Sequence, residues 1–395
     1  MAVALPIARR RTVSPWSRRA RFGVLVALAN LTLFNAYQVF RSVNPWPDFV
    51  YFLTFARVGL TYGEPRLYDP ALQQAALQAQ FPGAPFLGDV VNPPPLAWLL
   101  APLTLVPYDL ALWIWTASMI AALAVSSQLL APPGRYPRAL YAASLLGFLP
   151  AYLLVVSAPL APLVVLSVVL AWKLIRDDRE IAAGLVLAIG LLKPTLAVLV
   201  PFTLLAAGHR RLFMSWLVAA VVLVLASAAS IGPNGIKAYI AASASFASNP
   251  YYLRWSLVPF LGDGIAWVAA VLVIAGATMG IAWRLRRDGP EPVIAVGVMG
   301  SILVNHHMTP GDLMMLLAPI WMLARIPGGL VRTSLVGLAW VGGWLAMIFP
   351  AMALVVAATM EVMVLFRNAR PHGDLHSGGG DVDLVPRAGI EPATP

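Results

Sequence analysis

Long runs of apolar residues separated by short polar turns make up most of this chain. The first run, 22–40, is long enough for a helix to cross the hydrocarbon core of a bilayer, which takes roughly 17–25 residues. Eleven further apolar segments follow it, several of them shorter. They lie at 109–130, 139–156, 159–173, 181–192, 195–207, 212–231, 264–283, 292–304, 312–324, 333–349 and 351–366. The pattern predicts an all-α polytopic membrane protein, a bundle of about 12 transmembrane helices.

The longest polar stretch between two apolar runs is the loop 41–93. Within it, the segments 48–60 and 70–80 mix apolar and polar side chains at helical spacing, as helices on a membrane surface do. We therefore expect two short interfacial helices in this loop. The next apolar run, 96–106, stops at Pro107 and is too short to cross a bilayer unaided, so we interpret it as a re-entrant helix.

Composition supports the membrane assignment. Of the 395 residues, 60% are hydrophobic and only 11% are charged, which a polytopic membrane protein needs and a soluble core does not. Cysteine is absent, which excludes disulfides, a thiolate nucleophile and a cysteine-ligated metal. The net charge of +10 fits basic cytoplasmic loops that face anionic lipid better than it fits a nucleic-acid partner.

The distribution of Lys and Arg predicts how the chain is oriented. Residues 1–21 contain six arginines, and the positive-inside rule assigns this basic N-terminus to the cytoplasm. If the run 96–106 does not cross, most of the 27 Lys and Arg residues fall on that side. We therefore expect a transmembrane domain at 22–366 in the plasma membrane, with both termini cytoplasmic and the loop 41–93 exoplasmic. The Gly-, Pro- and charge-rich tail 367–395 is expected to be disordered.

This topology gathers the unusual polar residues on the exoplasmic side. Lys193 lies between two apolar runs, where it either snorkels to lipid headgroups or serves as a fixed cation for an anionic group such as a lipid phosphate. Arg254, among aromatic residues in the loop 232–262, is either an interfacial anchor or a binding residue. Because polar residues at membrane depth are costly, they are functional candidates by default.

Asp48 and two adjacent histidines complete the set of candidates. Asp48 follows Pro47 and precedes an apolar-periodic run, which is typical of a helix N-cap, although a cap residue can also act as a base. His306 and His307 would diverge by about 100° on a helix, so we do not expect them to share a metal ion. They are either exposed at a helix end, or one of them binds a sugar hydroxyl or phosphate or moves a proton.

The motifs of several other enzyme classes are missing from the sequence. There is no P-loop, no G-x-G-x-x-G that opens a helix, no H-E-x-x-H and no G-x-S-x-G. Nucleotide-driven chemistry and the standard hydrolase triads therefore have no support.

Four stretches of the chain carry a family resemblance. They are Asp48-Phe49-Val50-Tyr51-Phe52 through Leu67-Tyr68-Asp69, Asn92-Pro93-Pro94-Pro95-Leu96 with Leu99-Leu100-Ala101-Pro102-Leu103, Leu192-Lys193-Pro194, and Asn305-His306-His307 before Asp312-Leu313. Together they resemble the membrane glycosyltransferases of the GT-C class, and most of all glycosyltransferase family 87, the polyprenyl-phosphate-mannose-dependent α-(1→2)-mannosyltransferases. The resemblance covers the chain from about residue 22 to residue 366.

The resemblance implies an inverting transferase that needs no nucleotide, metal or other cofactor. It makes Asp48 the catalytic base that deprotonates the acceptor hydroxyl. It also suggests that Lys193 and one histidine, His306 or His307, stabilise the leaving phosphate. The further expected substrate-binding residues are Tyr51, Asp69 and Arg254.

The sequence thus predicts transfer of a mannosyl, or other hexosyl or pentosyl, unit from a polyprenyl-phosphate sugar to a lipid- or glycan-linked acceptor on the exoplasmic face. The Ala-, Pro- and Arg-rich composition suggests a high-GC bacterium, and for such a bacterium the resemblance implies an actinobacterial cell-envelope glycolipid. Two positions depart from the family pattern: Asn92 replaces an aromatic residue, and Ser157-Ala158 replaces a Gly-Gln pair. They keep an inactive membrane scaffold open as an alternative. A flippase for lipid-linked sugars is the other, and it would need charges deep inside several spans.

Overall fold

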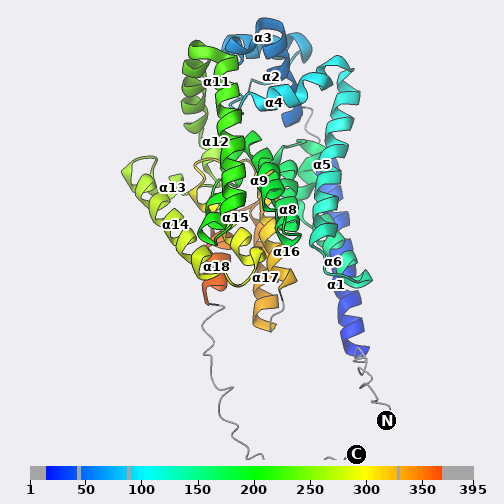
Figure 1. Ribbon diagram of the computed structural model, residues 1–395. Coiled ribbons are helices and arrows are strands. Elements are labelled where there is room, and N and C mark those ends of the chain that lie inside the picture. The colour runs from blue at the N-terminus through cyan, green and yellow to red at the C-terminus, as the bar shows by residue number, and fades with distance from the viewer. Residues whose placement is uncertain (1–14, 42–45, 87–89, 327–329, 367–395) are drawn as a thin grey trace, which may run out of the picture.

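The computed structural model describes residues 15–41, 46–86, 90–326 and 330–366, and every regular element in these ranges is a helix. Helix α1 (Pro15–Arg41) begins at one end of the molecule, and helix α18 (Met352–Phe366) ends at that same end (Figure 1). The tail 367–395 and the first part of the basic N-terminus lie outside the described residues, so the prediction of a disordered tail is not tested.

Between these two ends the chain alternates long α-helices with short broken pieces. The α-helices are α2 (Asp48–Tyr62), α3 (Pro70–Gln80), α4 (Pro95–Leu100), α5 (Tyr108–Leu130), α6 (Arg135–Leu146), α7 (Leu153–Val156), α8 (Ala161–Arg176), α9 (Glu180–Leu187), α10 (Val200–Ala206), α11 (Arg210–Ala247), α12 (Pro250–Leu253), α13 (Val258–Leu261), α14 (Ile265–Arg284), α15 (Pro290–Val304), α16 (Leu317–Arg325) and α17 (Leu330–Leu345). The 3₁₀ turns are η1 (Glu64–Arg66), η2 (Ala101–Leu105), η3 (Leu149–Tyr152), η4 (Ala188–Leu192), η5 (Pro194–Leu196) and η6 (Pro310–Leu316).

The two helices expected in the loop 41–93 are present. They are α2 and α3, which stand at the end of the molecule opposite to the start of α1 (Figure 1). Gly63 ends α2 with a φ of 87°, a left-handed conformation that favours glycine and turns the chain into η1. The run 96–106 forms the short pair α4 and η2, which is consistent with a segment that does not cross. The position of these helices at a membrane surface stays a prediction.

Helix α11 corrects the expected loop 232–262. The helical chain continues past residue 231 to Ala247, and the short helices α12 and α13 occupy most of the remainder. The predicted segment ended at residue 231, directly before Gly232 and Pro233, two residue types that commonly end a helix. The structure shows a kink instead, with Gly232 at φ 63° and Pro233 able to begin a new helical turn because it needs no backbone N–H donor there.

Fewer helices than the predicted 12 are long enough and apolar enough to cross a membrane. Four helices of the described chain are long and apolar enough to cross: α1 within Ala20–Gln38, α5, α11 and α14. A fifth is possible if α6 and the piece Leu149–Val156, bent by 70°, form one broken span. The other predicted segments are shorter or interrupted by 3₁₀ turns, so a bundle of 12 spans is not confirmed.

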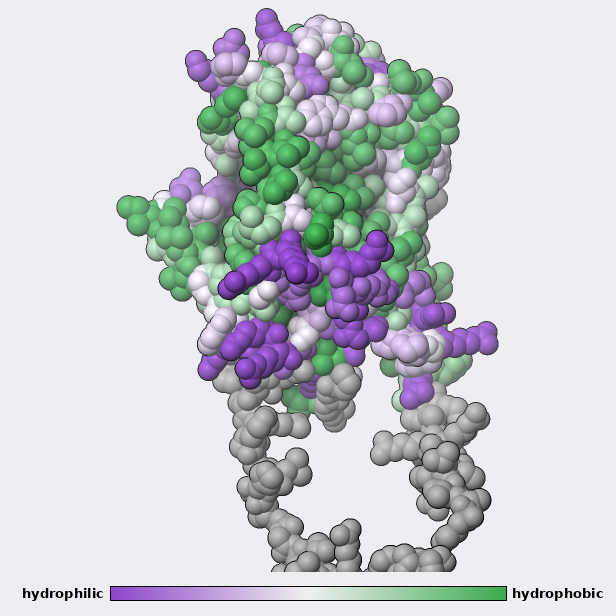
Figure 2. All heavy atoms as spheres, viewed as in Figure 1, coloured by the Kyte–Doolittle hydropathy of each residue, from purple (hydrophilic) through white to green (hydrophobic). Residues whose placement is uncertain are grey.

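The outer surface of the molecule carries a broad apolar zone. Figure 2 shows mainly hydrophobic side chains over the middle of this face, a mixture of hydrophilic and hydrophobic side chains at the top, and strongly hydrophilic side chains gathered below, over the lower part of α11 and its neighbours. Helices α11 and α14 contribute large exposed apolar residues, among them Leu225, Ile265 and Leu272, each more than 60% exposed. Such exposure in a soluble protein would be a liability. With the candidate spans it makes this chain a membrane protein.

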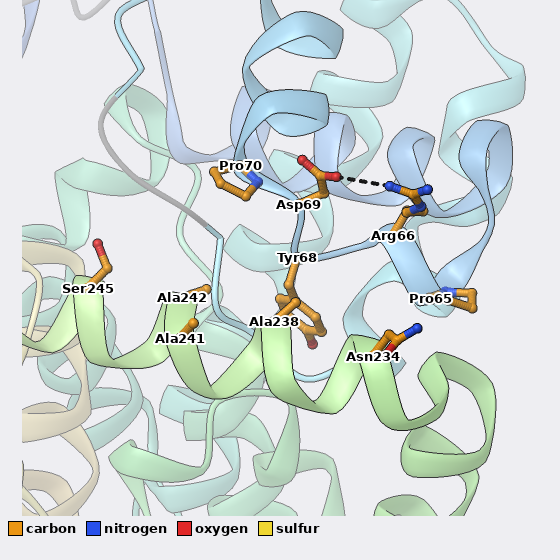
Figure 3. Close-up of a pocket in the computed structure, with 10 residues that line it drawn as sticks. All are labelled: Pro65, Arg66, Tyr68, Asp69, Pro70, Asn234, Ala238, Ala241, Ala242 and Ser245. Carbon is orange, nitrogen blue, oxygen red and sulfur yellow. Dashed lines mark hydrogen bonds and ion pairs between the residues drawn. The ribbon is translucent and has the colours of Figure 1, made fainter.

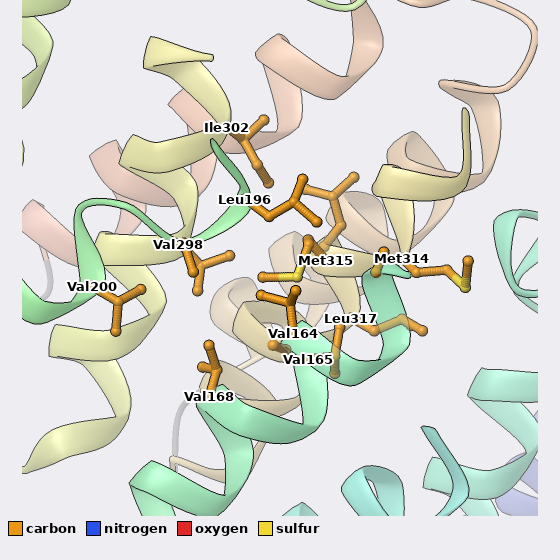
Figure 4. Close-up of a cluster of buried hydrophobic side chains, with 14 of the residues drawn as sticks. Val164, Val165, Val168, Leu196, Val200, Val298, Ile302, Met314, Met315 and Leu317 are labelled. Carbon is orange, nitrogen blue, oxygen red and sulfur yellow. The ribbon is translucent and has the colours of Figure 1, made fainter. Parts of the chain in front are cut away.

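Helix α15 forms the centre of the packed interior. Nearly all of its residues are buried, and it packs against α10, α14, α16 and α18. Figure 4 shows Val298 and Ile302 of α15 facing Val164 of α8 and Leu196 of η5, with Met315 between them. This apolar cluster holds the 3₁₀ turns η5 and η6 in place. Lys193 directly precedes η5, and Asp312 lies in η6.

Glu291 anchors the N-terminal end of α15. Its side chain is only 8% exposed, and its Oε1 atom lies 3.4 Å from a guanidinium nitrogen of Arg176 and 4.0 Å from Nε of Arg325. A buried carboxylate needs such partners, because desolvation of an unpaired charge is expensive. The two contacts join α15 to the ends of α8 and α16, at the end of α15 away from Asn305.

Helix α9 approaches α11 very closely, and Gly184 is the residue that permits it. A Cβ atom at this position would collide with the side chain of Ser215 and the carbonyl oxygen of Leu212, and it would lie 2.9 Å from the backbone nitrogen of Trp216. Two of these atoms belong to the backbone, which cannot turn aside as a side chain can. The contact positions α9, which leads through η4 to Lys193.

A side chain at residue 184 is therefore expected to destabilise the fold. Gly184→Val should lower the melting midpoint, since overpacking typically costs about 1–3 kcal/mol. Gly276→Ala in α14 is the control, because no atom lies within 4 Å of the position its Cβ would take. Melting of the purified fluorescent fusion, followed by size-exclusion chromatography, measures both. Equal midpoints for the two variants would contradict the close packing of α9 on α11.

Candidate functional site

Lys193 lies in a break between two helical pieces. It follows η4 and precedes η5, with a backbone φ of −145° that neither helix could accommodate. Its Nζ atom donates a hydrogen bond of 2.6 Å to Oδ1 of Asp312. The interpretation of Lys193 as a residue that snorkels to headgroups is therefore wrong, because its ammonium group is paired inside the protein.

Asp312 is held rigidly for this role. Its side chain is 1% exposed, and its second carboxylate oxygen accepts a 2.8 Å hydrogen bond from the backbone N–H of Thr309. The preceding residue, Gly311, packs so tightly on Pro159 that an added Cβ would lie 2.8 Å from a carbon of the proline ring. The turn before η6 thus fixes both the backbone and the carboxylate that faces Lys193.

Asp48 is the first residue of α2, and its neighbours Phe49 and Val50 are fully buried. The N-cap position belongs to Pro47, and the Asp48 side chain makes no capping hydrogen bond. The N-cap interpretation is therefore wrong. In the part of the chain that the structure describes, the Asp48 carboxylate has no hydrogen-bond partner, so it is free to accept one from a ligand.

The electrostatic surroundings of Asp48 raise its pKa from 3.8 to about 6. Burial is the main cause, because desolvation disfavours the charged carboxylate. The positive charge of Lys193 lowers this pKa, and the negative charge of Asp312 raises it. Both charges act on Asp48, so three residues far apart in the sequence form one electrostatic cluster, which we call the Asp48 cluster.

Tyrosine side chains surround this cluster. The charge of Asp48 contributes to raised pKa values of Tyr51, Tyr251 and Tyr252, after the effect of burial. The hydroxyl of Tyr51 donates a 2.9 Å hydrogen bond to the carbonyl oxygen of Pro85, so the ring has a fixed place beside Asp48. Phenol rings and hydroxyls near a carboxylate are the groups that bind the faces and edges of polar ligands.

The structure separates the two histidines, which lie in an irregular turn and not on a helix. The charges of Lys193 and Asp312 both act on His307, whose ring packs edge-on against Phe246 at 4.9 Å. Burial lowers the pKa of His307 to about 4. The imidazole is therefore neutral at physiological pH, and it can offer an N–H to an oxygen but no positive charge.

His306 faces away from the Asp48 cluster. Its ring packs edge-on against Trp267 of α14 at 4.8 Å, and its pKa is lowered by burial and raised by the charge of Asp263. The structure thus brings His307, and not His306, to the charges of Lys193 and Asp312. No feature of the sequence could distinguish the two, because they are adjacent and chemically identical.

The remaining candidates, Arg254 and Asp69, lie outside the Asp48 cluster. The guanidinium carbon of Arg254 lies 5.4 Å from the ring centre of Tyr251, and the residue is exposed. Asp69 caps α3, since its Oδ1 accepts hydrogen bonds from the N–H groups of Ala71 and Leu72, and it pairs with Arg66 at 3.4 Å. Asp69 therefore serves the fold of the first loop, outside the Asp48 cluster.

Asn92, which departs from the family pattern, helps to hold the Lys193 turn. Its side-chain amide donates a 3.1 Å hydrogen bond to the backbone carbonyl oxygen of Leu192. The backbone carbonyl oxygen of Asn92 accepts a 2.8 Å hydrogen bond from the hydroxyl of Tyr68. The second departure falls at Ala158, which is fully buried with a positive φ of 48°. Its carbonyl accepts a bond from Trp115, and its methyl group offers no polar contact to a ligand.

Several buried polar atoms near the Asp48 cluster have no partner within the described chain. They are Oγ1 of Thr195, Nδ2 of Asn305 and Nδ1 of His307. Buried polar groups are normally hydrogen-bonded, so orphaned ones gathered in one region indicate a polar ligand or water. A free carboxylate of raised pKa can take a proton from a hydroxyl group. The fixed cation beside it can hold an anion at the same time.

A comparison with known families decides the class of this protein. The sequence model of glycosyltransferase family 87 matches residues 91–309, which is more than half of the chain. The chain belongs to glycosyltransferase family 87. Neither the curated proteins nor the solved structures that were compared with it contain a match.

As a member of this family the protein is a glycosyltransferase. The matched range includes Asn92, Lys193, Arg254 and both histidines. The matched range begins after Asp48 and ends before Asp312. The assignment of these two carboxylates to the site therefore depends on the structure alone.

Sequence reasoning missed two parts of the site. Asp312 was noted only as an acid near the histidines, although the stretch Thr309-Pro310-Gly311-Asp312 has the spacing of a capping box, which signals an ordered turn. Phe246 and Tyr252, whose rings stack at 4.4 Å beside His307, were not singled out. No sequence signal marks them, because their proximity depends on how α11 and α12 meet.

The Lys193–Asp312 pair is expected to matter for stability in a way that a surface pair does not. Lys193→Met would leave Asp312 buried without a partner, a change that typically costs about 3–5 kcal/mol. The double variant Lys193→Met/Asp312→Asn removes both charges and should recover part of the loss. Lys173→Met is the control, since Lys173 and its partner Asp177 are both more than 40% exposed and such pairs are worth about 0–1 kcal/mol. Melting midpoints of the three proteins test this, and equal losses for the two single variants would contradict it.

Proposed function

We propose that this glycosyltransferase moves a mannosyl or related sugar from a polyprenyl-phosphate donor to a hydroxyl of a lipid- or glycan-linked acceptor. The observation that carries the proposal is the Asp48 carboxylate, which has a raised pKa, no hydrogen-bond partner in the described chain, and a fixed cation near it. The family membership supplies the reaction class, and the resemblance of the motifs supplies the donor.

Asp48 is the catalytic base of the proposed reaction. Its carboxylate takes the proton of the acceptor hydroxyl while the oxygen attacks the anomeric carbon of the donor. The bond between that carbon and the phosphate oxygen breaks, and the electron pair leaves with the polyprenyl phosphate. Because attack occurs opposite to the leaving group, a β-linked donor gives an α-linked product. One carboxylate suffices, since a phosphate leaving group departs without a general acid.

Lys193 and His307 are the proposed partners of the leaving phosphate. Lys193 is held by Asp312, so its ammonium group has a fixed direction and still has donors to spare, because an ammonium carries three N–H groups. His307 is neutral, with a pKa lowered to about 4. It therefore contributes a hydrogen bond, and not a positive charge, to the leaving phosphate. Tyr51 and Arg254 are the further proposed binding residues, because the charge of Asp48 acts on Tyr51 and Arg254 packs over the ring of Tyr251, on which the same charge acts.

The orientation of the protein follows from the positive-inside argument. Residues 1–21 are cytoplasmic in this proposal, and the first loop and the Asp48 cluster face the exoplasmic side of the plasma membrane. A donor on a polyprenyl lipid fits such a site, because its sugar is presented at the membrane surface while the lipid chain stays in the bilayer. No metal ion is required, since the donor contains no nucleotide diphosphate.

Among the residues that the structure describes, no network of paired charges inside the spans supports the flippase alternative. Glu361 of α18 is the clearest acidic residue at that depth, and its Oε1 accepts a 3.0 Å hydrogen bond from Thr278 of α14. Its bonding is local and joins two helices. We therefore retain the transferase as the proposed function.

Replacement of the base is the direct test. Asp48→Asn keeps the shape of the side chain and removes its basicity, so transfer from polyprenyl-phosphate-[¹⁴C]mannose to endogenous lipid should fall by about 10²–10⁴-fold. Asp109→Asn is a matched control, because Asp109 is an exposed acid in the first turn of α5. Membranes with equal amounts of each protein would be compared. Full activity in Asp48→Asn would place the base elsewhere, and no transfer by the wild type would reject the proposed donor or the reaction.

The pH dependence of transfer tests the electrostatics of the same site. A base must be deprotonated, and the pKa of Asp48 is raised to about 6, so the rate should rise through that pH and level off above it. The charge of Lys193 lowers this pKa, so Lys193→Met should move the acid limb of the residual activity to higher pH. Lys173→Met, at an exposed pair, should leave the limb in place. An acid limb that does not move in Lys193→Met would contradict the coupling.

A further inference from the structure

A groove of about 730 Å³ separates the first loop from the C-terminal half of α11 (Figure 3). Tyr68, Asp69 and Arg66 lie along one wall, and the other wall is a single face of α11 from Asn234 to Ser245. Pockets that take small organic ligands have volumes of about 300–1,000 Å³. None of the groups assigned to the Asp48 cluster lines this groove.

The wall made by α11 is open because its residues are small. The alanines that face the groove, such as Ala241, recur at helical spacing and leave room where larger side chains would fill it. From Asn234 to Ser245 the helix rises by about 16 Å, at 1.5 Å per residue. Next to Asn234, α11 approaches η1 closely, since a Cβ atom added at Gly235 would lie 3.3 Å from the carbonyl oxygen of Pro65.

The polar groups of the groove are balanced in charge. Arg66 and Asp69 form an ion pair of 3.4 Å at the rim, with side chains 65% and 30% exposed. Asn234 and Ser245 make no hydrogen bond in the described part of the chain through their side-chain amide and hydroxyl groups. The groove therefore offers donors and acceptors with no net charge, which suits a neutral ligand rich in hydroxyl groups and gives no advantage to an anion.

Both walls of the groove are connected to the Asp48 cluster through neighbouring residues. Ser245 is followed by Phe246, which contacts the rings of Tyr252 and His307 at 4.4 and 4.9 Å. On the other wall, Tyr68 donates to Asn92 and Asn92 donates to the carbonyl of Leu192, the residue before Lys193. The charge of Asp48 acts on Tyr252, so a chain-like ligand that extends from the groove past Ser245 would approach the proposed reaction centre.

We propose that this groove binds the neutral glycan portion of the acceptor and directs its terminal hydroxyl towards Asp48. The inference rests on the proposed function and names the place and the chemistry of the second substrate. The length of the groove suits several sugar units in a row. An isoprenoid chain fits it poorly, because such a chain would cover the amide of Asn234 and the hydroxyl of Ser245 without giving either group a hydrogen bond, and it would take water from the Arg66–Asp69 pair.

The absence of cysteine permits a test with a single introduced thiol. Ala241→Cys places the thiol in the groove, and Ile240→Cys is the matched control, because the neighbouring residue points about 100° away and is 62% exposed. Each protein is reconstituted in lipid nanodiscs, since glycoside detergents would compete for a sugar site. Labelling by a fluorescent maleimide is then timed with mannotriose, with farnesyl phosphate and with neither.

Mannotriose should slow the labelling of Ala241→Cys and leave that of Ile240→Cys unchanged. Protection by farnesyl phosphate instead would assign the groove to the donor lipid and overturn the inference, and no protection by either probe would also overturn it. Protection by mannotriose in a protein that shows no transfer would keep the glycan site and reject the proposed function.

A second measurement links the groove to the acceptor during turnover. Reaction of Ala241→Cys with a bulky methanethiosulfonate should raise the KM for the acceptor and leave the KM for the donor unchanged, and a reducing agent should restore the original value. Reversal shows that the protein has not unfolded. A rise in the donor KM alone, or an unchanged acceptor KM after complete labelling, would contradict the assignment.

Discussion

The ion pair between Lys193 and Asp312 is the constraint on which the centre of this protein depends. Its members are 119 residues apart, and each stands in a stretch where the regular helix has given way to 3₁₀ turns. A carboxylate that is only 1% exposed needs a charged partner, because burying an unpaired charge costs a large amount of free energy. The pair therefore ties η5 to η6, and the apolar cluster around α15 packs over both turns.

Broken helices are also the reason why the span count could not be predicted from the sequence. Hydrophobic periodicity located almost every helix, including α2 and α3 to within a few residues, since burial of an apolar face leaves its mark along the chain. It could not show that 188–196 and 310–316 are 3₁₀ turns. Irregular backbone at depth is stable only where protein surrounds it, and that condition depends on neighbours far away in sequence. The end of the helix predicted at residue 231 was wrong for another reason. Gly232 does interrupt the helical backbone, but Pro233 begins a new helical turn directly after it, so the helical chain kinks and continues.

The sequence predicted those parts of the candidate site that depend on the type of a single residue. It could not predict those that depend on which residues pack around a side chain in the fold. Asp48 and Lys193 stood out because a charge beside apolar runs needs a reason. The choice of His307 over His306 depends on which ring faces Lys193, and its neutrality depends on burial. Asn92 shows a further limit. As a departure from the family pattern it suggested lost function, yet its amide supports the backbone just before Lys193.

The charges of the Asp48 cluster suggest how the base is restored in the proposed reaction. Lys193 and Asp312 cancel each other, so an arriving phosphodiester adds a negative charge near Asp48 and raises its pKa further, making it a better base once the donor is bound. After transfer, Asp48 holds the acceptor proton and the leaving group has become a phosphate monoester. Such a group can itself accept a proton, since its second pKa is about 6. The departing lipid phosphate can therefore carry the acceptor proton away from Asp48, whose raised pKa falls back once the added negative charge has left. One carboxylate without a hydrogen-bond partner in the described chain, next to a neutralised cation, serves both halves of the cycle.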